Sequence, residues 1–417
     1  MKLVLIGAGQ RGMNYARYAF AKGHPIMAVA EPNDARRAIA TAAFGIPDHL
    51  CFRTGAELLA HPRMGDAAII ATMDRDHGQE AIPAMRLGYD LLLEKPISPD
   101  PLETLAIADT ARQTGRRVVI CHVLRYAPFF RQIKQILDSG ELGRIVAIDH
   151  TENIGNYHMA HSFVRGNWRN TAESSPILLQ KSCHDLDLLL WLTGRHVRRV
   201  FSVGALSFFR PENAPQGSAA RCVDCPVAEG CRFDARRVYL PIAGYWPATA
   251  VTEDQTEAGL LRALQTGPYG RCVYRCDNDV CDHQSVAMEF EDGATAVFTL
   301  CGMTDQIHRT IHIMCEHGEL WGDDGAGTIR ISRFRSSHTD TMEDRCITMG
   351  RTPGGHGGGD QGLMEAFLAD PGEGDRIVSD VARSVESHLL AFAAEESRLT
   401  GRGLEMRAFE NQLRNKG

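Results

Sequence analysis

The sequence predicts an α/β protein in which a doubly wound parallel sheet is followed by an α+β domain with an open, mainly antiparallel sheet. In the first part, residues 1–122, apolar strand patterns alternate with helical patterns, and a glycine-rich turn follows the first strand directly. In the second part, residues 123–417, two apolar runs flank Glu291-Asp-Gly293, which is typical of a hairpin. A length of 417 residues also favours about two domains.

The glycine-rich turn predicts that the first domain binds a dinucleotide. An apolar strand at residues 3–6 runs into Gly7-Ala-Gly9-Gln-Arg-Gly12. The three glycines permit, in order, a tight turn, the close approach of a pyrophosphate and tight packing of the next helix on the strand. This combination is the fingerprint of a Rossmann domain, and the N–H groups at the start of that helix suit phosphate oxygens.

The end of the second strand indicates which dinucleotide is bound. The apolar run 26–30 ends in Glu31, whose carboxylate suits the hydroxyls of an adenosine ribose and repels a 2′-phosphate. The sequence therefore favours NAD over NADP, although Arg36 and Arg37 keep NADP as an alternative.

Polar residues follow the ends of the later strands of this domain. Further strands are predicted at 67–71, 91–93 and 118–121, with helices at 13–21, 79–87 and 101–114. Because ligands of such sheets bind at the carboxyl ends of the strands, the residues placed there should face the cofactor. They are Thr72, Asp74, His77, Glu94 and Lys95.

The second domain begins with a helix at 128–137, a strand at 143–149 and a strongly apolar helix at 177–193. Later strands are predicted at 284–290, 294–300, 308–316 and 320–321, before an amphipathic final helix at 381–399. Two insertions interrupt this order: residues 210–281, which carry clustered cysteines, and the glycine-rich residues 350–360. In the second, His356 and Asp360 indicate either a loop that closes on a substrate or a surface loop.

Two sets of residues carry the predicted chemistry. Lys95, in Glu94-Lys95-Pro96, follows a buried strand, where apolar walls suit it to proton transfer or to polarising a substrate oxygen. On the helix 177–193, polar side chains recur at helical spacing on an otherwise apolar segment, with His184 as a proton acceptor and Asp187 placed to fix its tautomer. The members of this second set are Gln180, Lys181, His184 and Asp187.

Composition excludes some partners. The chain is 44% hydrophobic and 23% charged, with a net charge of −7, which argues against nucleic acid and anionic membranes. No apolar run is long enough to span a bilayer, and glycines and Arg11 interrupt the N-terminal run too early for a signal peptide. We therefore expect a cytoplasmic protein.

Half of the 12 cysteines lie in the insertion. In a reducing compartment such clustering favours metal over disulfides, and a closed tetrahedral site of thiolates would be structural and not catalytic. A structural zinc is the preferred interpretation, with an iron–sulfur cluster or free thiols as alternatives. The candidate ligands are Cys222, Cys225, Cys231, Cys272 and Cys276.

With these motifs in place, the chain resembles the Gfo/Idh/MocA family of NAD(P)-dependent oxidoreductases. The resemblance covers roughly residues 1–200 and the later hairpin sheet. Besides the glycine-rich turn, it rests on Ile70-Ala-Thr72, His77, Glu94-Lys95-Pro96, His122, Arg125-Tyr126, Gly143, Trp168-Arg169, His184-x-x-Asp187 and Trp191-Leu-Thr-Gly194.

The resemblance implies roles for these residues. Members typically oxidise or reduce a ring carbon of a sugar, cyclitol or related polyol. Lys95 would contact the reacting hydroxyl, His184 would be the catalytic histidine, and Lys181 is a third catalytic candidate. The Lys95–Pro96 peptide would be cis, and the open sheet would join copies of the chain into a homodimer or homotetramer.

The predicted binding sets follow from the motifs and the resemblance together. The cofactor set is Gly7, Gly9, Gln10, Arg11, Gly12, Glu31, Thr72, Asp74, His77, Glu94, Lys95, Trp168 and Arg169. The substrate set is Lys95, Tyr126, Asn153, His158, His161, Lys181 and His184.

One position departs from the family pattern. Many sugar dehydrogenases of the family have an aspartate four residues before the histidine, where this chain has Gln180 followed by Lys181. A Lys-Lys-His arrangement would suit a negatively charged substrate, such as a sugar acid.

Three functions compete. The first is an NAD-dependent dehydrogenase of a sugar, cyclitol or sugar acid. The second is a glycoside hydrolase that recycles NAD through transient oxidation, elimination and addition of water. The third, a cofactor-sensing regulator, has no use for both Lys95 and His184.

Overall fold

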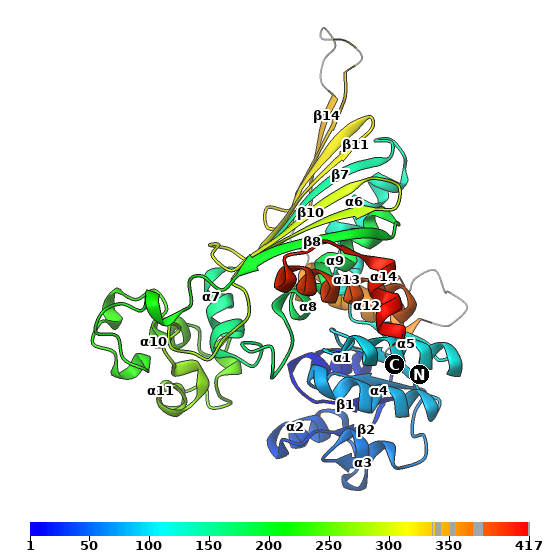
Figure 1. The fold of residues 1–417 in the computed structure, drawn as a ribbon. Helices are drawn as coiled ribbons and strands as arrows, with labels where there is room; N and C mark the ends of the chain where they lie inside the picture. Colours follow the sequence, from blue (N-terminus) through cyan, green and yellow to red (C-terminus); the bar gives the residue numbers. More distant parts are fainter. Residues whose placement is uncertain (336, 338–342, 351–354, 370–377, 416–417) are drawn as a thin grey trace.

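The computed structural model describes residues 1–335, 337, 343–350, 355–369 and 378–415. The first domain is a six-stranded parallel sheet in the order β3-β2-β1-β4-β5-β6, and the second is built on a nine-stranded sheet, with an insertion beside them both (Figure 1).

The first sheet confirms the predicted doubly wound fold. Its strands are β1 (Leu3–Ile6), β2 (Ile26–Ala30), β3 (Cys51–Phe52), β4 (Ala67–Ile70), β5 (Asp90–Leu93) and β6 (Val118–Ile120), all paired in parallel. Its helices are α1 (Gln10–Ala21), α2 (Asp34–Phe44), α3 (Gly55–Leu59), α4 (His77–Arg86) and α5 (Pro101–Thr114). Local signals fix their ends: Asp100 caps α5 by accepting from the Leu102 N–H, and Gly115 ends it in the left-handed region.

The second sheet is mostly antiparallel, in the order β14-β13-β12-β11-β7-β10-β9-β8-β15. Its strands are β7 (Ile145–Asn153), β8 (Val197–Ala205), β9 (His283–Phe290), β10 (Thr295–Cys301), β11 (His308–Cys315), β12 (Gly318–Asp323), β13 (Thr328–Arg333), β14 (Glu343–Thr348) and β15 (Leu404–Glu405). The central pair β7 and β10 is parallel, so this sheet is mixed.

One face of the second sheet is covered and the other is open. The helices of this part are α6 (Pro128–Asp138), α7 (Asn156–His158), α8 (Ile177–Gln180), α9 (Cys183–Thr193), α10 (Ala235–Tyr239), α11 (Glu257–Thr266), α12 (Gly359–Leu368), α13 (Val381–Thr400) and α14 (Met406–Arg414). Helices α9 and α13 lie against the covered face (Figure 1). The open face presents a row of side chains in register, in which Phe201, Val297 and Trp321 are roughly half exposed.

Three sequence predictions need correction. The helix expected at 177–193 is two helices, because α8 ends at Gln180 and α9 begins at Cys183. The amphipathic helix α13 is not the last one, since α14 follows it. The glycine-rich segment is not an open loop over its described residues, because 355–358 form a short turn that leads into α12.

Helix α12, from the C-terminal part of the sequence, packs on the first domain. Its buried residues, among them Leu363, Met364 and Phe367, share one apolar core with Leu3 and Leu5 of β1. The first domain therefore takes part of its core from the C-terminal part of the sequence.

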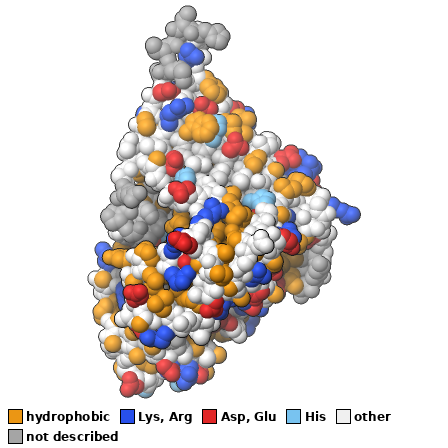
Figure 2. All heavy atoms as spheres, turned by 90° about the vertical axis from the view of Figure 1, so that its left-hand side faces the viewer, with side chains coloured by type: hydrophobic (Ala, Val, Ile, Leu, Met, Phe, Trp, Pro, Cys, Tyr) orange, Lys and Arg blue, Asp and Glu red, His pale blue; other side chains and the backbone are white. Residues whose placement is uncertain are grey.

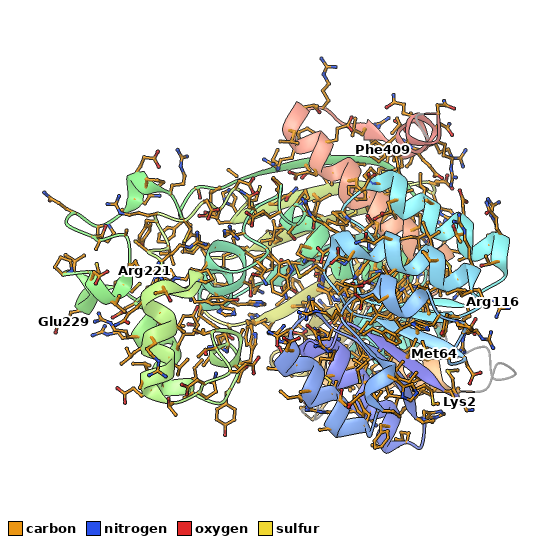
Figure 3. All side chains as sticks on the ribbon, turned by 90° about the horizontal axis from the view of Figure 1, so that it is seen from below. Lys2, Met64, Arg116, Arg221, Glu229 and Phe409 are labelled. Carbon is orange, nitrogen blue, oxygen red and sulfur yellow. The ribbon has the colours of Figure 1, made fainter. Side chains whose placement is uncertain are left out.

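The insertion stands to one side of both domains. Arg221 and Glu229 lie on it, far from Lys2 and Met64 of the first domain (Figure 3). Helices α10 and α11 build a small apolar core of their own around Tyr239, Leu260 and Leu264.

Candidate active site

The glycine-rich turn has the shape of a dinucleotide cradle. Gly7 has a φ of +89°, and a Cβ there would lie 2.6 Å from the Ala71 carbonyl oxygen. A Cβ on Gly12 would lie 2.0 Å from the Gly7 oxygen, whereas a Cβ on Gly9 would meet nothing within 4 Å. The turn is therefore packed where strand and helix meet and open where a pyrophosphate would lie.

Glu31 lies at the end of β2, as the sequence predicts. Its carboxylate accepts from the N–H groups of Ala8, at 2.8 Å, and Asn33, at 2.9 Å, which fixes it beside the turn. Each oxygen keeps acceptor capacity for a ribose hydroxyl. Arg37 is bound to the Glu31 carbonyl and to Asp34, which leaves it poorly placed for a 2′-phosphate.

Glu94 organises the boundary between cofactor and substrate. One of its oxygens accepts from the Arg11 Nε and the Tyr15 hydroxyl, both at 2.8 Å, and the other accepts from the Lys95 N–H at 2.9 Å. Contact with Arg11 and Lys95 lowers the pKa of Glu94 against the effect of its burial. Glu94 is thus saturated by the protein and positions Lys95.

Lys95 points into the cavity between the domains. Its Nζ donates to the Gln180 carbonyl oxygen at 2.8 Å, and the peptide to Pro96 is cis, as the family resemblance implies. The cavity has a volume of about 820 Å³ and runs from Gln10 and Arg11 to the edge of the second sheet. Charged, histidine and hydrophobic side chains lie side by side on the face that Figure 2 shows.

Other predicted residues reach this cavity too. Its lining includes Gln10, Arg11, Lys95, His158, Trp168, Gln180 and Lys181. The insertion supplies Trp246, whose ring is 38% exposed and meets the His158 ring edge-on at 5.0 Å. No sequence motif marked Trp246 as a residue of the site.

His184 is buried beneath the cavity and is not among its lining residues. Its ring packs against those of His122, at 5.6 Å, and His356, at 6.0 Å. Burial, followed by the charge of Lys95, lowers its pKa well below the usual value, so the ring is neutral near pH 7.

Asp187 does not hold the tautomer of His184, contrary to the sequence prediction. It forms a bidentate pair with Arg125, with both distances at 2.6 Å, and lies 3.6 Å from His122. Both residues lie on α9, but the carboxylate is taken by Arg125, which is 62 positions away in the sequence.

Lys181 belongs to a buried charge network. Its Nζ lies 3.0 Å from Glu152, which also pairs with Arg309 at 2.5 Å. Arg309 in turn pairs with Asp185 at 2.7 Å, and the His150 ring donates to the same carboxylate at 2.8 Å. Two cations therefore face two carboxylates, and Lys181 does not provide an uncompensated positive charge.

The Gln180 side chain is hydrogen-bonded to the Asp74 carboxylate. Its side-chain nitrogen donates to Asp74 at 3.0 Å, and the Ser174 hydroxyl reaches the same carboxylate at 3.4 Å. Asp74, predicted as a cofactor residue, is therefore buried and tied to the second domain.

Six further residues of the predicted site make contacts within the protein. The Tyr126 hydroxyl contacts Ser379 at 3.0 Å, His161 stacks on Tyr269 at 4.6 Å, and Arg169 pairs with Asp277 at 2.8 Å. The remaining three are bound close to their own strands. Thr72 donates to Glu80, His77 contacts the Pro96 carbonyl, and Asn153 contacts His308. None of the six lines the cavity.

The structure does not support the predicted zinc. Within the described part of the chain, no group of three or more His, Cys, Asp or Glu side chains is arranged to hold a metal ion. Four of the five cysteines line a cavity of only about 20 Å³, and Cys276 is not among them. Buried Arg165 lines it too, and its guanidinium donates to the Cys222 sulfur and to the Phe233 and Arg271 carbonyls. These hydrogen bonds and the apolar core of the insertion hold it together.

Two family models match the chain. The model described as the oxidoreductase family with an NAD-binding Rossmann fold covers residues 1–122, and that described as the GFO/IDH/MocA C-terminal domain covers residues 130–238.

Curated relatives are oxidoreductases. "Putative oxidoreductase YteT" of Bacillus subtilis is 25% identical over 72% of this chain and 71% of that protein. "Inositol 2-dehydrogenase 4" of Saccharopolyspora erythraea is 28% identical over 52% of this chain, and the match spans 60% of its length.

Solved structures share the fold. Levoglucosan dehydrogenase in complex with NADH and levoglucosan has a TM-score of 0.70 at 16% identity, covering 97% of this chain and 99% of that one. An oxidoreductase from Agrobacterium radiobacter in complex with NAD+, L-tartaric acid and magnesium has a TM-score of 0.69 at 14% identity, covering 98% of this chain and 99% of that one.

Of the described helices, none has the length and apolar character needed to cross a membrane.

Proposed function

The chain belongs to the Gfo/Idh/MocA family of NAD-binding oxidoreductases, and we propose that it transfers hydride between NAD and a ring carbon of a neutral polyol, a sugar or a cyclitol. The observation that carries the proposal is the position of Lys95, which enters the shared cavity directly beside the cofactor turn. The similarity to inositol and levoglucosan dehydrogenases supports a polyol substrate.

Charge balance favours a neutral substrate over a sugar acid. Lys181 was the candidate for binding a carboxylate, but Glu152 neutralises it at 3.0 Å. Arg11 is likewise committed to Glu94 and Asp360. A carboxylate that bound to Lys181 or Arg11 would have to displace these partners, which costs the energy of an ion pair.

The residues present fit NAD and divide the work of the reaction. Bound NAD supplies the acceptor for the hydride. The glycine turn and Glu31 hold the dinucleotide, and Glu94 positions Lys95. The Lys95 ammonium donates a hydrogen bond to the reacting oxygen and stabilises the negative charge that develops on it.

A second candidate function has support from Trp246. An NAD-recycling glycosidase needs an apolar surface for a leaving group next to the oxidised sugar, and Trp246, which is 38% exposed, is among the residues that line the cavity. An aglycone would stack there.

One experiment separates the candidates. Purified protein is incubated with NAD and a panel of sugars, cyclitols, uronates and glycosides, while NADH absorbance and released aglycone are followed together. Accumulating NADH with a keto product on neutral polyols supports the proposal. NAD-dependent aglycone release without net NADH supports the glycosidase, and NADH formed only with uronates contradicts the neutral-substrate proposal. Binding of NAD without turnover of any compound would favour a sensor.

A further inference from the structure

His356 occupies an unusual backbone position at the cavity. Its φ of +51° lies in the left-handed region, and no other non-glycine residue of the described chain has a positive φ. Such a conformation is strained for a residue with a side chain, and strained residues cluster at functional sites. Glycines surround it in the sequence, and at two of them a side chain would collide with a neighbouring residue. A Cβ on Gly355 would lie 1.9 Å from Asp360, and a Cβ on Gly359 would lie 2.3 Å from the Val123 oxygen.

The His356 ring is held by a carboxylate that is itself fixed. Its Nδ1 lies 3.1 Å from Asp360, and both oxygens of Asp360 accept from Arg11, each at 2.8 Å. Arg11 is anchored in turn to Glu94. Because the Asp360 carboxylate accepts a hydrogen bond from Nδ1–H, the neutral ring presents an unprotonated Nε2.

His356 reaches the cavity, whereas His184 does not. His356, Lys95 and Lys181 all line it, and 38% of the His356 side chain is exposed. His184 lies behind this ring, at a centroid distance of 6.0 Å. The position before His184 where many family members have an acid is Gln180, which cannot accept a proton at neutral pH.

We propose that His356, oriented by the Asp360 carboxylate that Arg11 clamps, is the group that exchanges a proton with the substrate hydroxyl. The inference rests on the proposed dehydrogenase function. During oxidation the hydroxyl proton passes to Nε2, and the C–H hydrogen leaves with its electron pair as hydride to NAD. The C=O bond forms, and the imidazolium returns its proton to solvent. Lys95 stabilises the oxygen throughout.

Four charged or titratable groups set the proton affinity of this ring. Asp360 faces it from α12, Arg11 from α1, Lys181 from the break after α8 and His184 from α9. Burial lowers the pKa of His356, Arg11 and Lys181 lower it further, and Asp360 opposes them. The ring is therefore neutral near pH 7, and the oxidation rate should rise with pH through this pKa and then level off.

The test uses full-length protein with NAD and the best polyol of the panel. Variants His356→Gln and Asp360→Asn are compared with the wild type, and His196→Gln is the control, since His196 is exposed and paired with Glu386. We expect His356→Gln to slow hydride transfer by about 10²–10⁴-fold and to abolish the acidic limb of the rate profile. Asp360→Asn should move that limb to lower pH, because a carboxylate that raises the pKa is removed.

A second readout does not depend on turnover. In ¹⁵N-histidine NMR of the wild type, assigned by the missing signal of His356→Gln, His356 should be the tautomer protonated on Nδ1, and Asp360→Asn should lose this preference. Wild-type rates and an unchanged acidic limb in His356→Gln, or a ring protonated on Nε2, would overturn the role of His356 and leave the dehydrogenase proposal standing. If the wild type oxidises nothing in the panel, the proposed function fails, and the tautomer alone decides whether Asp360 orients this ring.

Discussion

Lys95 is held from both sides of the cleft. Its N–H is bound by Glu94 of the first domain, and its Nζ by the Gln180 carbonyl of the second. The ammonium is thereby aimed into the cavity before a substrate arrives, so little reorganisation is needed when charge develops on the substrate oxygen.

Removing this ammonium should therefore affect turnover much more than cofactor binding. We expect Lys95→Met to lower kcat by about 10²–10⁴-fold, with an unchanged Kd for NADH measured by fluorescence titration. Lys134→Met is a matched control, because Lys134 pairs with Asp138 on α6 outside the cavity. A comparable loss in both variants, or a large loss of NADH affinity in Lys95→Met, would contradict the assigned role.

Glu80 predicts a specific pH dependence of stability. It is 7% exposed, and burial raises its pKa to about 7, although the Thr72 hydroxyl opposes this shift. The folded state thus binds a proton that the unfolded state releases above pH 4.5. The associated stability is complete at lower pH and is lost as the pH rises towards 7.

Glu80→Gln tests this pH dependence, because it removes the titrating carboxyl group. Across this pH window the wild type should lose about 3 kcal/mol of unfolding free energy relative to the variant, as measured by urea denaturation. Parallel profiles of the two proteins would show that Glu80 titrates normally in the folded state.

At the scale of single residues, the sequence predicted positions better than partners. Lys95 and Glu31 follow the strand ends that the motifs predict, and Lys181 lies in the break after α8 and not within a helix. The partners of Lys181 and Arg11, namely Glu152 and Asp360, could not be predicted. Arg11 and Asp360 are 349 positions apart, and they meet only in the folded chain, where α1 contacts α12. For the same reason Asp187 was assigned to nearby His184 and not to Arg125.

At the scale of elements, strands and helices with strong periodicity were placed almost correctly. The hairpin β9–β10 and helix α13 match the predictions within one residue at each end. The break at Lys181 and Ser182 was missed because apolar residues lie on both sides of it and neither proline nor glycine marks an end there. Helix α12 was missed because its glycine-rich start is typical of a loop, whereas those glycines permit close packing on Val123.

In the turn between β1 and α1, we expect one glycine to matter for folding stability and another for binding of the dinucleotide. Gly12→Ala should lower the free energy of unfolding by about 1–3 kcal/mol, because its methyl group collides with the Gly7 oxygen. Gly9→Ala, which meets no protein atom, should keep the melting temperature but raise the Kd for NAD about tenfold or more, since the methyl group takes the space of the pyrophosphate. Calorimetry measures both. An unchanged NAD affinity in Gly9→Ala would show that the pyrophosphate binds elsewhere.

At the scale of the whole molecule, the open face of the second sheet predicts association. Phe201, Val297 and Trp321 lie in one row across the strands and are 42%, 43% and 46% exposed. Large apolar side chains exposed together on an open sheet face are typical of an interface. We expect the wild type to be a dimer or tetramer joined through this face.

The double substitution Phe201→Lys with Val297→Lys should reduce the particle mass in light scattering, because two buried charges per copy would oppose the contact. Leu399→Lys is the control, since Leu399 is 69% exposed on α13, away from the open face. A monomeric wild type, or an assembly that survives the double substitution, would exclude this surface.

The position of α12 has a consequence for biosynthesis. A ribosome releases β1 to β6 long before it makes Leu363 and Phe367, which complete the core over β1. During that interval the apolar core that α1 and α2 form with this sheet lacks the side chains of α12, and exposed apolar surface of this kind promotes aggregation. Truncation or premature termination before residue 359 would leave this core incomplete, so the products of such events should depend on chaperones or be degraded.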